Sequence, residues 1–561
     1  MRRTGPVWRR PLQVGIAVLV VLTAMVILPA PRDALAAYAE QVLYRFCSQT
    51  NCVDGKNPAA ALIMDGGGNL YGTTVSGGAN NGGAVFKLTP IATGWTYNVL
   101  YSFCSKALCA DGGTPHAGLI MDGTGNLYGT TTGGGPNQST SGLVFKLVPS
   151  GNGWTETVLY SFCTQSNCTD GAQPYGTLIM DAAGNLYGTT AAGGNRNSAC
   201  SANGCGTVFE LSPTVSGWTE KVLYRFCSQS NCADGVQPLA GVAMDGVGNL
   251  YGTTFSGGST AGVIFELMPS GSSWTEKLLH AFGSSASDGD SPQANLIIDG
   301  AGNLYGTTFN GGGSGFGTCA GSCGAVFELS STDSTWSENT LHGFGDGDGA
   351  FPAAGVIMDG AGHLYGSTSG GGSGAHVCFL DGGNYGCGVA FQLAFTGTSW
   401  TETVLYSFCP QSNCVDGAEP RAGLIMDGAG NLYGTTYQGG NSSNAGVVFA
   451  LGSSNTLSVS LNGSGGGKVT SSPTGIDCGS TCSAKFNAGT QVTLTASPAA
   501  AWGLTGWGGA CGGIGGCTVT LNANTSVSAT FTTLFTAAQP PVVTSPSDIP
   551  VLPAVIGPLP Q

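Results

Sequence analysis

The sequence predicts an all-β protein: a seven-bladed β-propeller closed by its own N-terminal strand, followed by a small C-terminal β-grasp-like domain. Three observations lead to this prediction. Glycine contributes 96 of the 561 residues and charged residues only 9%, a composition typical of turn-rich sheet proteins. The phrase Gly-Asn-Leu-Tyr-Gly-Thr-Thr occurs seven times, with one variant copy. Its copies are 54 to 68 residues apart, which fits a four-stranded blade with loops and is too long for a solenoid coil.

The repeated phrase sets the number of blades. The seven copies place their tyrosines at Tyr71, Tyr128, Tyr187, Tyr251, Tyr305, Tyr365 and Tyr433. In the first unit, four β-patterned runs a, b, c and d follow one another at 61–65, 69–74, 84–88 and 95–103, and a glycine-rich hairpin turn joins a to b. Each unit is therefore predicted to be an antiparallel meander. Gly72 inside run b is expected to let a neighbouring sheet approach closely.

Strand d is missing from the last unit and is found at the start of the chain. Residues 38–44 align with the strand d of residues 154–160. A closed ring of blades explains this arrangement, because the N-terminal strand then completes the seventh blade and removes exposed sheet edges. We therefore predict a propeller over residues 38–452. The tryptophans of strand d are expected to pack within or between blades rather than to stack on sugars; they are Trp95, Trp154, Trp218, Trp274, Trp336 and Trp400.

Residues 1–37 are predicted to be a cleaved secretory signal peptide. They combine a basic start, an apolar run over 12–28 and the small-x-small sequence Ala34-Leu35-Ala36. The apolar run is 17 residues long, so an uncleaved membrane anchor is the alternative. No later segment is apolar enough to cross a membrane, and a secreted, extracellular or cell-surface location is expected.

The twenty cysteines are predicted to form local disulfides, which persist in exported proteins. They fall into ten close pairs: Cys47/Cys52, Cys104/Cys109, Cys163/Cys168, Cys200/Cys205, Cys227/Cys232, Cys319/Cys323, Cys378/Cys387, Cys409/Cys414, Cys478/Cys482 and Cys511/Cys517. Zinc binding is the alternative, but zinc sites need two converging pairs with closer spacing, and histidine is scarce.

The formal net charge of −14 argues against a nucleic-acid partner. Much of the acidity lies in aspartates that recur in every repeat. One of them belongs to an Asp-Gly-x-x-Pro phrase at Asp54, Asp111, Asp170, Asp234, Asp288, Asp348 and Asp416. We expect these carboxylates to cap turns. Two loops lack the cysteine pair and carry Asp288 with Asp290, or Asp346 with Asp348, so calcium in place of the disulfide is an alternative there.

No catalytic motif is recognisable, and no catalytic, cofactor-binding or metal-binding residue is assigned. The five histidines do not share one repeat position: His280 and His342 replace the strand d tyrosine, and the other three lie elsewhere in the repeat. His116, His376 and Arg421 break the symmetry of the repeat, as unique residues near the axis of propeller enzymes often do, but they do not define a mechanism. In a meander the d–a and b–c connections emerge on one face, and the b–c loops vary most in length. That face is the candidate binding surface, and tolerated insertion without a function is the alternative explanation of the variable loops.

The Leu-Tyr-Gly-Thr-Thr phrase, followed by Gly-Gly and then Val-Phe-x-Leu as in residues 70–88, resembles the GloVer-type tandem repeat of exported bacterial proteins. The resemblance covers about residues 38–452 and implies repeats and export but no established activity. Residues 455–533 resemble the divergent bacterial repeat domain related to internalin B-repeats, through Gly467 to Val469, Val492 to Pro498, Gly506-Trp507 and Val527 to Phe531. That resemblance implies a small β-grasp-like surface module. Residues 534–561 are rich in proline and expected to be a disordered tail.

These features predict a secreted or cell-surface binding protein that recognises a glycan or a protein through the face bearing the Cys loops and the b–c loops. Trp502 and Trp507 in the C-terminal domain are further candidates for contact with a polysaccharide or a protein. A structural surface protein without a discrete ligand is the alternative, and a propeller hydrolase or lyase is a third class. The sequence leaves the oligomeric state open.

Overall fold

The structure is a computed structural model. It describes residues 38–533 except 92–93, 136–140, 152, 199, 201–202, 259–260, 286, 314–322, 333–334, 346, 374–377, 381–382, 411–412, 480, 488–489 and 522–523. The predicted signal peptide and the predicted tail lie outside the described residues. The described chain contains strands, four 3-10 turns (Thr50–Cys52, Ala107–Cys109, Ser166–Cys168 and Ser230–Cys232) and no α-helix. Among these residues, no helix has the length and apolar character that a membrane crossing requires.

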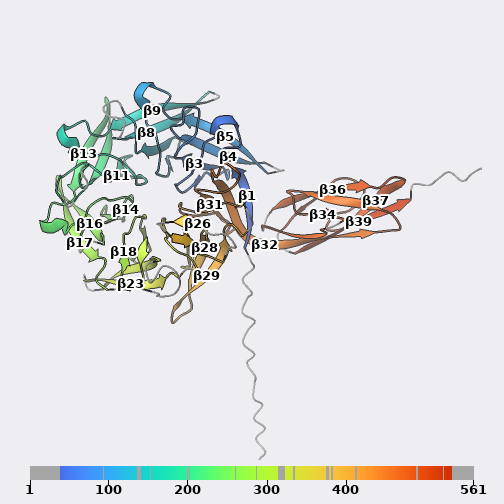
Figure 1. Ribbon diagram of the computed structural model, residues 1–561. Coiled ribbons are helices and arrows are strands. Elements are labelled where there is room, and N and C mark those ends of the chain that lie inside the picture. The colour runs from blue at the N-terminus through green and yellow to red at the C-terminus, as the bar shows by residue number, and fades with distance from the viewer. Residues whose placement is uncertain are drawn as a thin grey trace, which may run out of the picture. The chain divides into compact units, whose positions relative to one another are not determined.

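Six antiparallel sheets of four strands each follow one another along the chain (Figure 1). Sheet 1 contains β2 (Ile63–Met64), β3 (Leu70–Thr74), β4 (Ala84–Ile91) and β5 (Gly94–Ser102). Sheet 2 contains β6 (Ile120–Met121), β7 (Leu127–Thr131), β8 (Leu143–Ser150) and β9 (Gly153–Ser161). Sheet 3 contains β10 (Ile179–Met180), β11 (Leu186–Thr190), β12 (Thr207–Thr214) and β13 (Gly217–Arg225). Sheet 4 contains β14 (Ala243–Met244), β15 (Leu250–Thr254), β16 (Val263–Ser270) and β17 (Ser273–Ala281). Sheet 5 contains β19 (Ile297–Ile298), β20 (Leu304–Thr308), β22 (Ala325–Thr332) and β23 (Thr335–Gly343). Sheet 6 contains β24 (Ile357–Met358), β25 (Leu364–Thr368), β28 (Val389–Phe395) and β29 (Trp400–Ser407). Two short pairs, β18 (Gly289–Asp290) with β21 (Asn310–Gly311) and β26 (Cys378–Leu380) with β27 (Gly383–Tyr385), lie in loops.

Sheet 7 joins the two ends of the repeat region. Its strands are β30 (Ile425–Met426), β31 (Leu432–Thr436), the first half of β32 (Val447–Asn462), and β1 (Tyr38–Arg45). β1 runs antiparallel to β32, with Tyr38 opposite Ser453 and Arg45 opposite Val447. Figure 1 shows the blue β1 beside β31 and β32. The N-terminal strand therefore lies in the place of the missing strand d.

Neighbouring sheets contact one another in chain order. The outermost strands touch in the sequence β1, β5, β9, β13, β17, β23 and β29, and β29 touches β1. The inner strands are also linked, since Thr73 Oγ1 donates to the main-chain oxygen of Ala117 in the next sheet at 3.1 Å. The same link recurs from Thr130, Thr189, Thr253, Thr307 and Ser367. The sheets are thus propeller-like blades.

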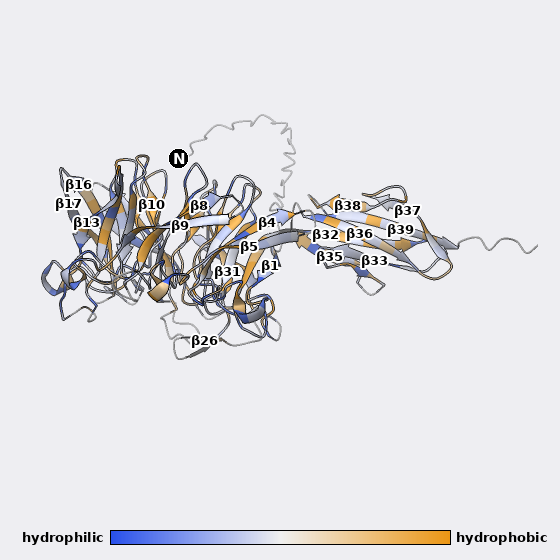
Figure 2. Ribbon diagram, turned by 90° about the horizontal axis from the view of Figure 1, so that it is seen from above, coloured by the Kyte–Doolittle hydropathy of each residue, from blue (hydrophilic) through white to orange (hydrophobic). Residues whose placement is uncertain are grey.

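The repeated phrase forms the core of each sheet. All five residues of β3 are buried, and the apolar colouring in Figure 2 follows the strands. Gly72 faces the ring of Phe86 on the adjacent strand of the same sheet, where an added Cβ would lie 2.6 Å from Phe86 Cζ. The expectation that this glycine admits a neighbouring sheet is therefore wrong, because a phenylalanine of its own sheet covers it.

The strand d tryptophans pack between neighbouring sheets. Packing within or between blades was expected, and the second arrangement is the one observed. Trp154 of sheet 2 packs in the cluster that contains Tyr71 of sheet 1. Tyr38 of β1 takes the tryptophan's place in sheet 7, where it packs in the cluster of Tyr365 from sheet 6. The a–b turns are capped by aspartate, as predicted: Asp65 Oδ1 accepts from the main-chain nitrogens of Gly67 and Asn69, both at 2.9 Å.

The C-terminal domain consists of two sheets around one core. The first contains the second half of β32 with β35 (Ser483–Asn487), β37 (Trp502–Gly509) and β39 (Thr525–Thr533); the second contains β33 (Gly467–Ser472), β34 (Asp477–Cys478), β36 (Gln491–Pro498) and β38 (Cys517–Thr520). Buried residues of both sheets form a single cluster. A β-grasp packs its sheet on a helix, and the described part of this domain has none, so the β-grasp-like expectation is wrong. β32 crosses the predicted boundary at 452–455 as one strand.

Candidate functional site

The d–a loops fold around the aspartate of the Asp-Gly-x-x-Pro phrase. Asp111 is fully buried, and its Oδ2 accepts hydrogen bonds from Tyr101 Oη, Ser105 N and Ser105 Oγ at 2.8, 2.8 and 2.7 Å. Asp54, Asp170 and Asp234 repeat this arrangement. The carboxylate therefore caps the loop, as turn chemistry predicts.

Nine of the ten predicted disulfides are present, from Cys47–Cys52 to Cys511–Cys517. The tenth pair, Cys319/Cys323, includes a residue outside the described part of the chain. Two groups of three sulfur atoms lie close together, Cys200 with Cys227 and Cys232, and Cys387 with Cys409 and Cys414. Because all six cysteines are disulfide-bonded, they offer no thiolate to a metal.

The residue before each repeat proline adopts a left-handed conformation, which non-glycine residues seldom do. Glu419, with φ of 54°, donates from its main-chain nitrogen to Cys387 O of the preceding sheet at 2.9 Å, and its oxygen accepts from Tyr437 N at 2.9 Å. The same φ region is occupied by Asn57, Thr114, Gln173, Gln237, Ser291 and Phe351. These paired hydrogen bonds hold the loop between two sheets and fix the direction in which the following residues enter strand a.

The residues that follow the seven prolines surround one cavity of about 560 Å³. They are Ala59, His116, Tyr175, Leu239, Gln293, Ala353 and Arg421, one from each sheet, and Phe309, Ser369 and Tyr437 from the b–c loops complete the lining. We call this the axial cavity. A second cavity of about 380 Å³ shares the same seven residues and continues along the strands a. Small-ligand sites have volumes of about 300–1,000 Å³, so the axial cavity is of suitable size.

Arg421 is held in place by two contacts. Its Nη2 donates to Glu419 Oε2 at 2.9 Å, and its guanidinium lies 4.2 Å from the centre of the Tyr437 ring. Glu419 is only 2% exposed, and burial raises its pKa against the opposing effect of Arg421. The cation–π contact and the ion pair together restrain the guanidinium at the cavity.

His116 and Tyr175 form a second polar side of the cavity, with ring centres 4.9 Å apart. Burial, together with the charge of Arg421, lowers the pKa of His116 to about 4. The imidazole is therefore neutral at neutral pH and offers one donor and one acceptor. The cavity thus combines a fixed cation, neutral hydrogen-bonding groups and aromatic faces, a set suited to binding.

Two of the three symmetry-breaking residues singled out in the sequence, His116 and Arg421, lie at this cavity, and His376 lies outside the described residues. Sequence reasoning missed Tyr175, Gln293 and Leu239. A pattern in the repeats could have found them: the residue after the proline varies among Ala, His, Tyr, Leu, Gln and Arg, whereas the next residue is alanine in six of the seven repeats.

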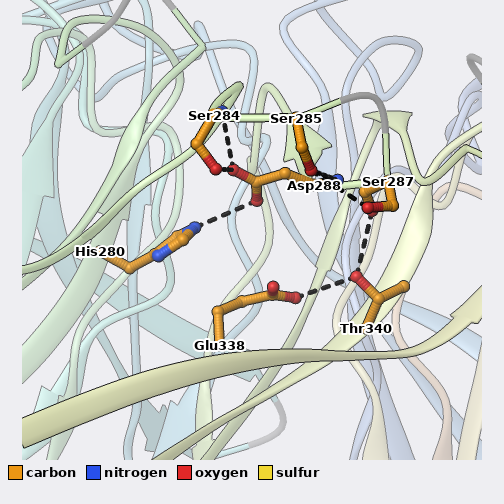
Figure 3. Close-up of polar contacts among 7 residues, drawn as sticks. All are labelled: His280, Ser284, Ser285, Ser287, Asp288, Glu338 and Thr340. Carbon is orange, nitrogen blue, oxygen red and sulfur yellow. Dashed lines mark hydrogen bonds and ion pairs between the residues drawn. The ribbon is translucent and has the colours of Figure 1, made fainter.

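A second polar cluster lies in the loop between sheets 4 and 5, which lacks a cysteine pair (Figure 3). His280 Nε2 is 3.0 Å from Asp288 Oδ1, and Ser284 donates to Asp288 Oδ2 from N at 2.9 Å and from Oγ at 2.7 Å. Glu338 reaches the cluster from the next sheet, and ligand atoms of His280, Asp288 and Glu338 lie within 4.8 Å of one another. Burial, which alone raises the pKa of Asp288, is outweighed by these hydrogen bonds, so its pKa is lowered.

The loop between sheets 5 and 6 has a related arrangement, with His342 Nε2 3.2 Å from Asp348 Oδ2. Histidine thus replaces tyrosine as the partner of the capping aspartate in both loops. Asp290, proposed with Asp288 as a calcium ligand, accepts a hydrogen bond from Ser291 Oγ and is not among the groups with converging ligand atoms in the described chain. Asp346 lies outside the described residues.

The two C-terminal tryptophans differ in exposure. Trp507 is buried in the domain core, where its Nε1 donates to Gly515 O at 2.9 Å, so its proposed role as a contact for a polysaccharide or protein is wrong. Trp502 is partly exposed, and its role stays a prediction.

The fold and its repeats define the class of this protein as an all-β repeat protein with propeller-like sheets. The chain belongs to the Gloeobacter/Verrucomicrobia repeat family, whose model matches residues 36–229 and 197–380. The divergent InlB B-repeat domain matches residues 457–534. No curated protein matches the chain.

Similar solved structures include a putative oxidoreductase (glucose dehydrogenase) from Thermus thermophilus, with 15% identity, a TM-score of 0.32, and coverage of 59% of this chain and 94% of that one. YjhT has 13% identity and a TM-score of 0.36, and the match covers 65% of this chain and all of YjhT.

Proposed function

We propose that this protein is an exported binding protein whose axial cavity recognises a glycan. In this proposal the seven sheets of residues 38–452 form a seven-bladed β-propeller closed by β1, and residues 455–533 form an appended surface module. The disulfides are compatible with an extracellular location. The cavity lies on the face formed by the d–a and b–c loops, the face expected to bind.

One observation carries this proposal. The ring of residues after the seven prolines lines a cavity and differs from sheet to sheet, while the adjacent packing position is almost invariant within the chain. Packing constrains the alanine position, because that residue is buried in most sheets. The lining position escapes that constraint and has acquired polar and aromatic groups, which suit the hydroxyls and the apolar faces of sugar rings.

A glycan fits this site better than a protein partner, because the polar groups line a confined cavity and a protein interface needs an extended patch. Glycan-array binding of the oxidised, mature chain, with and without calcium, tests the proposal. We expect saturable binding that weakens at least tenfold in Tyr175→Ala and Gln293→Ala. Val247→Ala is the matched control, because Val247 is 79% exposed in an a–b turn on the opposite face.

Three results would overturn the proposal. Capture of a protein that survives both cavity substitutions would favour a protein partner bound through the loops. Cleavage of the bound glycan would favour a hydrolase or lyase. Absence of binding by every glycan, with the chain folded, would favour a structural surface protein.

A further inference from the structure

The charge of the axial cavity contrasts with the charge of the chain. The sequence has 31 acidic and 17 basic residues, yet among the described residues that line the cavity the charged side chain is the guanidinium of Arg421. Cavities with one sign of charge and low-dielectric walls concentrate ligands of the opposite sign. The counter-ion of Arg421, Glu419, is only 2% exposed and does not line the cavity, so the lining favours an anionic ligand over a cationic one.

The contacts of Arg421 leave it able to bind such a ligand. Glu419 is bonded to one nitrogen, Nη2, and the guanidinium carbon lies over the face of the Tyr437 ring, 4.2 Å from its centre. A guanidinium carries five N–H donors in a planar fork. The donors that Glu419 does not use can pair with a second carboxylate, and the guanidinium is already oriented, which lowers the entropy lost on binding.

The other residues that line the cavity suit a hydroxylated ligand with a single negative charge. The sheet of Ala59 lies between the sheets of Arg421 and His116 in the order of contacts, and alanine has the smallest side chain after glycine. His116, Tyr175 and Gln293 offer neutral hydrogen-bonding groups to hydroxyls. Phe309 and Tyr437 bring aromatic rings to the lining, and aromatic side chains suit the apolar side of a sugar ring.

We propose that the axial cavity binds a sugar acid, a carboxylate-bearing residue of an acidic polysaccharide, with Arg421 pairing with its carboxylate. This inference rests on the proposed function of the cavity and names its ligand class. A sugar acid is favoured over the carboxyl terminus of a peptide, because three neutral hydrogen-bonding side chains, His116, Tyr175 and Gln293, share the cavity with a single cation.

Calorimetric titration of the oxidised, mature chain tests the inference. The probes are trimers of galacturonate, glucuronate and mannuronate, each with its methyl ester, which keeps the ring and removes the charge. We expect one acid to bind at least tenfold more tightly than its ester, and its affinity to fall with added salt. Arg421→Gln should remove this preference for the acid.

Because Arg421→Gln leaves a buried glutamate unpaired, the double variant Glu419→Gln/Arg421→Gln is measured beside it. It should lose the preference for the acid while it keeps the melting temperature close to that of the natural chain. Arg225→Gln is the control, since Arg225 donates to Thr169 O in a d–a loop and does not line the cavity; its affinity should be unchanged.

The outcomes separate this inference from the proposed function. Three results would overturn the inference and leave a binding cavity. The first is equal affinity for an acid and its ester, and the second is stronger binding of sulfated sugars or carboxyl-terminal peptides. The third is array binding of neutral glycans alone that depends on Tyr175. Absence of binding by every glycan would overturn both.

Discussion

Tyr97 donates a hydrogen bond from its hydroxyl to the main-chain oxygen of Asp54 across the contact between sheets 7 and 1. The other six sheets have a glutamate in the place of Tyr97: Glu40, Glu156, Glu220, Glu276, Glu338 and Glu402. Each of these glutamates faces the capping aspartate of the loop that enters its sheet, as Glu40 faces Asp416. Six contacts between sheets therefore bring two carboxyl groups together.

This pairing predicts that stability rises as the pH falls toward the mildly acidic range. Burial and the facing aspartate raise the pKa of Glu40 to about 8, and those of Glu220 and Glu276 to about 7. Since the ordinary value is 4.5, the folded chain binds these protons more tightly than the unfolded chain. The resulting stability is present in full below pH about 4.5 and is lost as the pH rises through 7 to 8.

Below that range the trend should reverse, because hydrogen bonds lower the pKa of capping aspartates such as Asp65 and Asp111. The unfolding free energy, measured by urea titration with circular dichroism, should therefore increase from about pH 8 to about pH 5 and decrease in stronger acid. Glu40→Gln should flatten the upper part of this profile and stabilise the chain at pH 8. A profile in Glu40→Gln identical to that of the natural chain would contradict the assignment.

The pairing of β1 with β32 predicts that the N-terminal strand stabilises the whole repeat region. Removal of residues 38–45 from a chain that starts at Tyr38 exposes the edge of β32, and exposed edges promote aggregation. We expect a lower melting temperature and a concentration-dependent oligomer in size-exclusion chromatography. A synthetic peptide of residues 38–45 should restore both properties, and the same peptide with Val42→Pro should fail, because proline breaks the pairing opposite Phe449.

A truncated chain with an unchanged melting temperature and a monomeric elution volume would show that sheet 7 does not need its fourth strand. The ring closure proposed above would then be wrong.

The sheets were predictable because each repeat supplies the same local pattern seven times. The β-patterned runs and the glycine turn after Asp65 indicated the meander. Six strand d tryptophans for seven copies of strand b indicated that residues 38–44 supply the fourth strand of sheet 7. Local disulfides were predictable for a similar reason, since their cysteines are five residues apart in the repeated loops. The two-sheet arrangement of the C-terminal domain was not, because its short strands lack a repeat and β32 pairs with β39 from the far end of the domain.

The candidate site was predictable only in part. His116 and Arg421 stood out because their chemistry is rare in the chain, whereas Tyr175 and Gln293 have no unusual chemistry. Their place at the cavity depends on the left-handed residue before each proline, such as Gln173 with φ of 56°. This conformation cannot be predicted from residue type, because residues as different as Asn57 and Phe351 adopt it.

Leu108 predicts a stabilising substitution. It lies in the Cys104–Cys109 loop with φ of 57°, and it is 86% exposed. The equivalent residues Asn51, Asn167 and Asn231 have φ of 58°, 60° and 56°, and asparagine tolerates this conformation better than leucine. Leu108→Asn should therefore raise the unfolding free energy by about 1 kcal/mol.

The reverse change provides the matched test of that explanation. Asn167→Leu should lower the unfolding free energy by a similar amount, while Ala107→Asn beside Leu108 should have little effect. If Leu108→Asn and Ala107→Asn stabilised equally, the gain would come from the added polar side chain and not from the backbone conformation.

The loop of Asp288 predicts the response to calcium. His280 and Ser284 already hydrogen-bond to both carboxylate oxygens of Asp288, so a calcium ion would have to displace His280, and the remaining oxygen ligands are fewer than the six to eight that calcium takes. We expect differential scanning calorimetry to give the same melting temperature in millimolar calcium and in a chelator. A calcium-dependent rise that disappears in Asp288→Asn/Asp290→Asn, but persists in Asp234→Asn of a disulfide-bearing loop, would instead show that calcium replaces the missing disulfide.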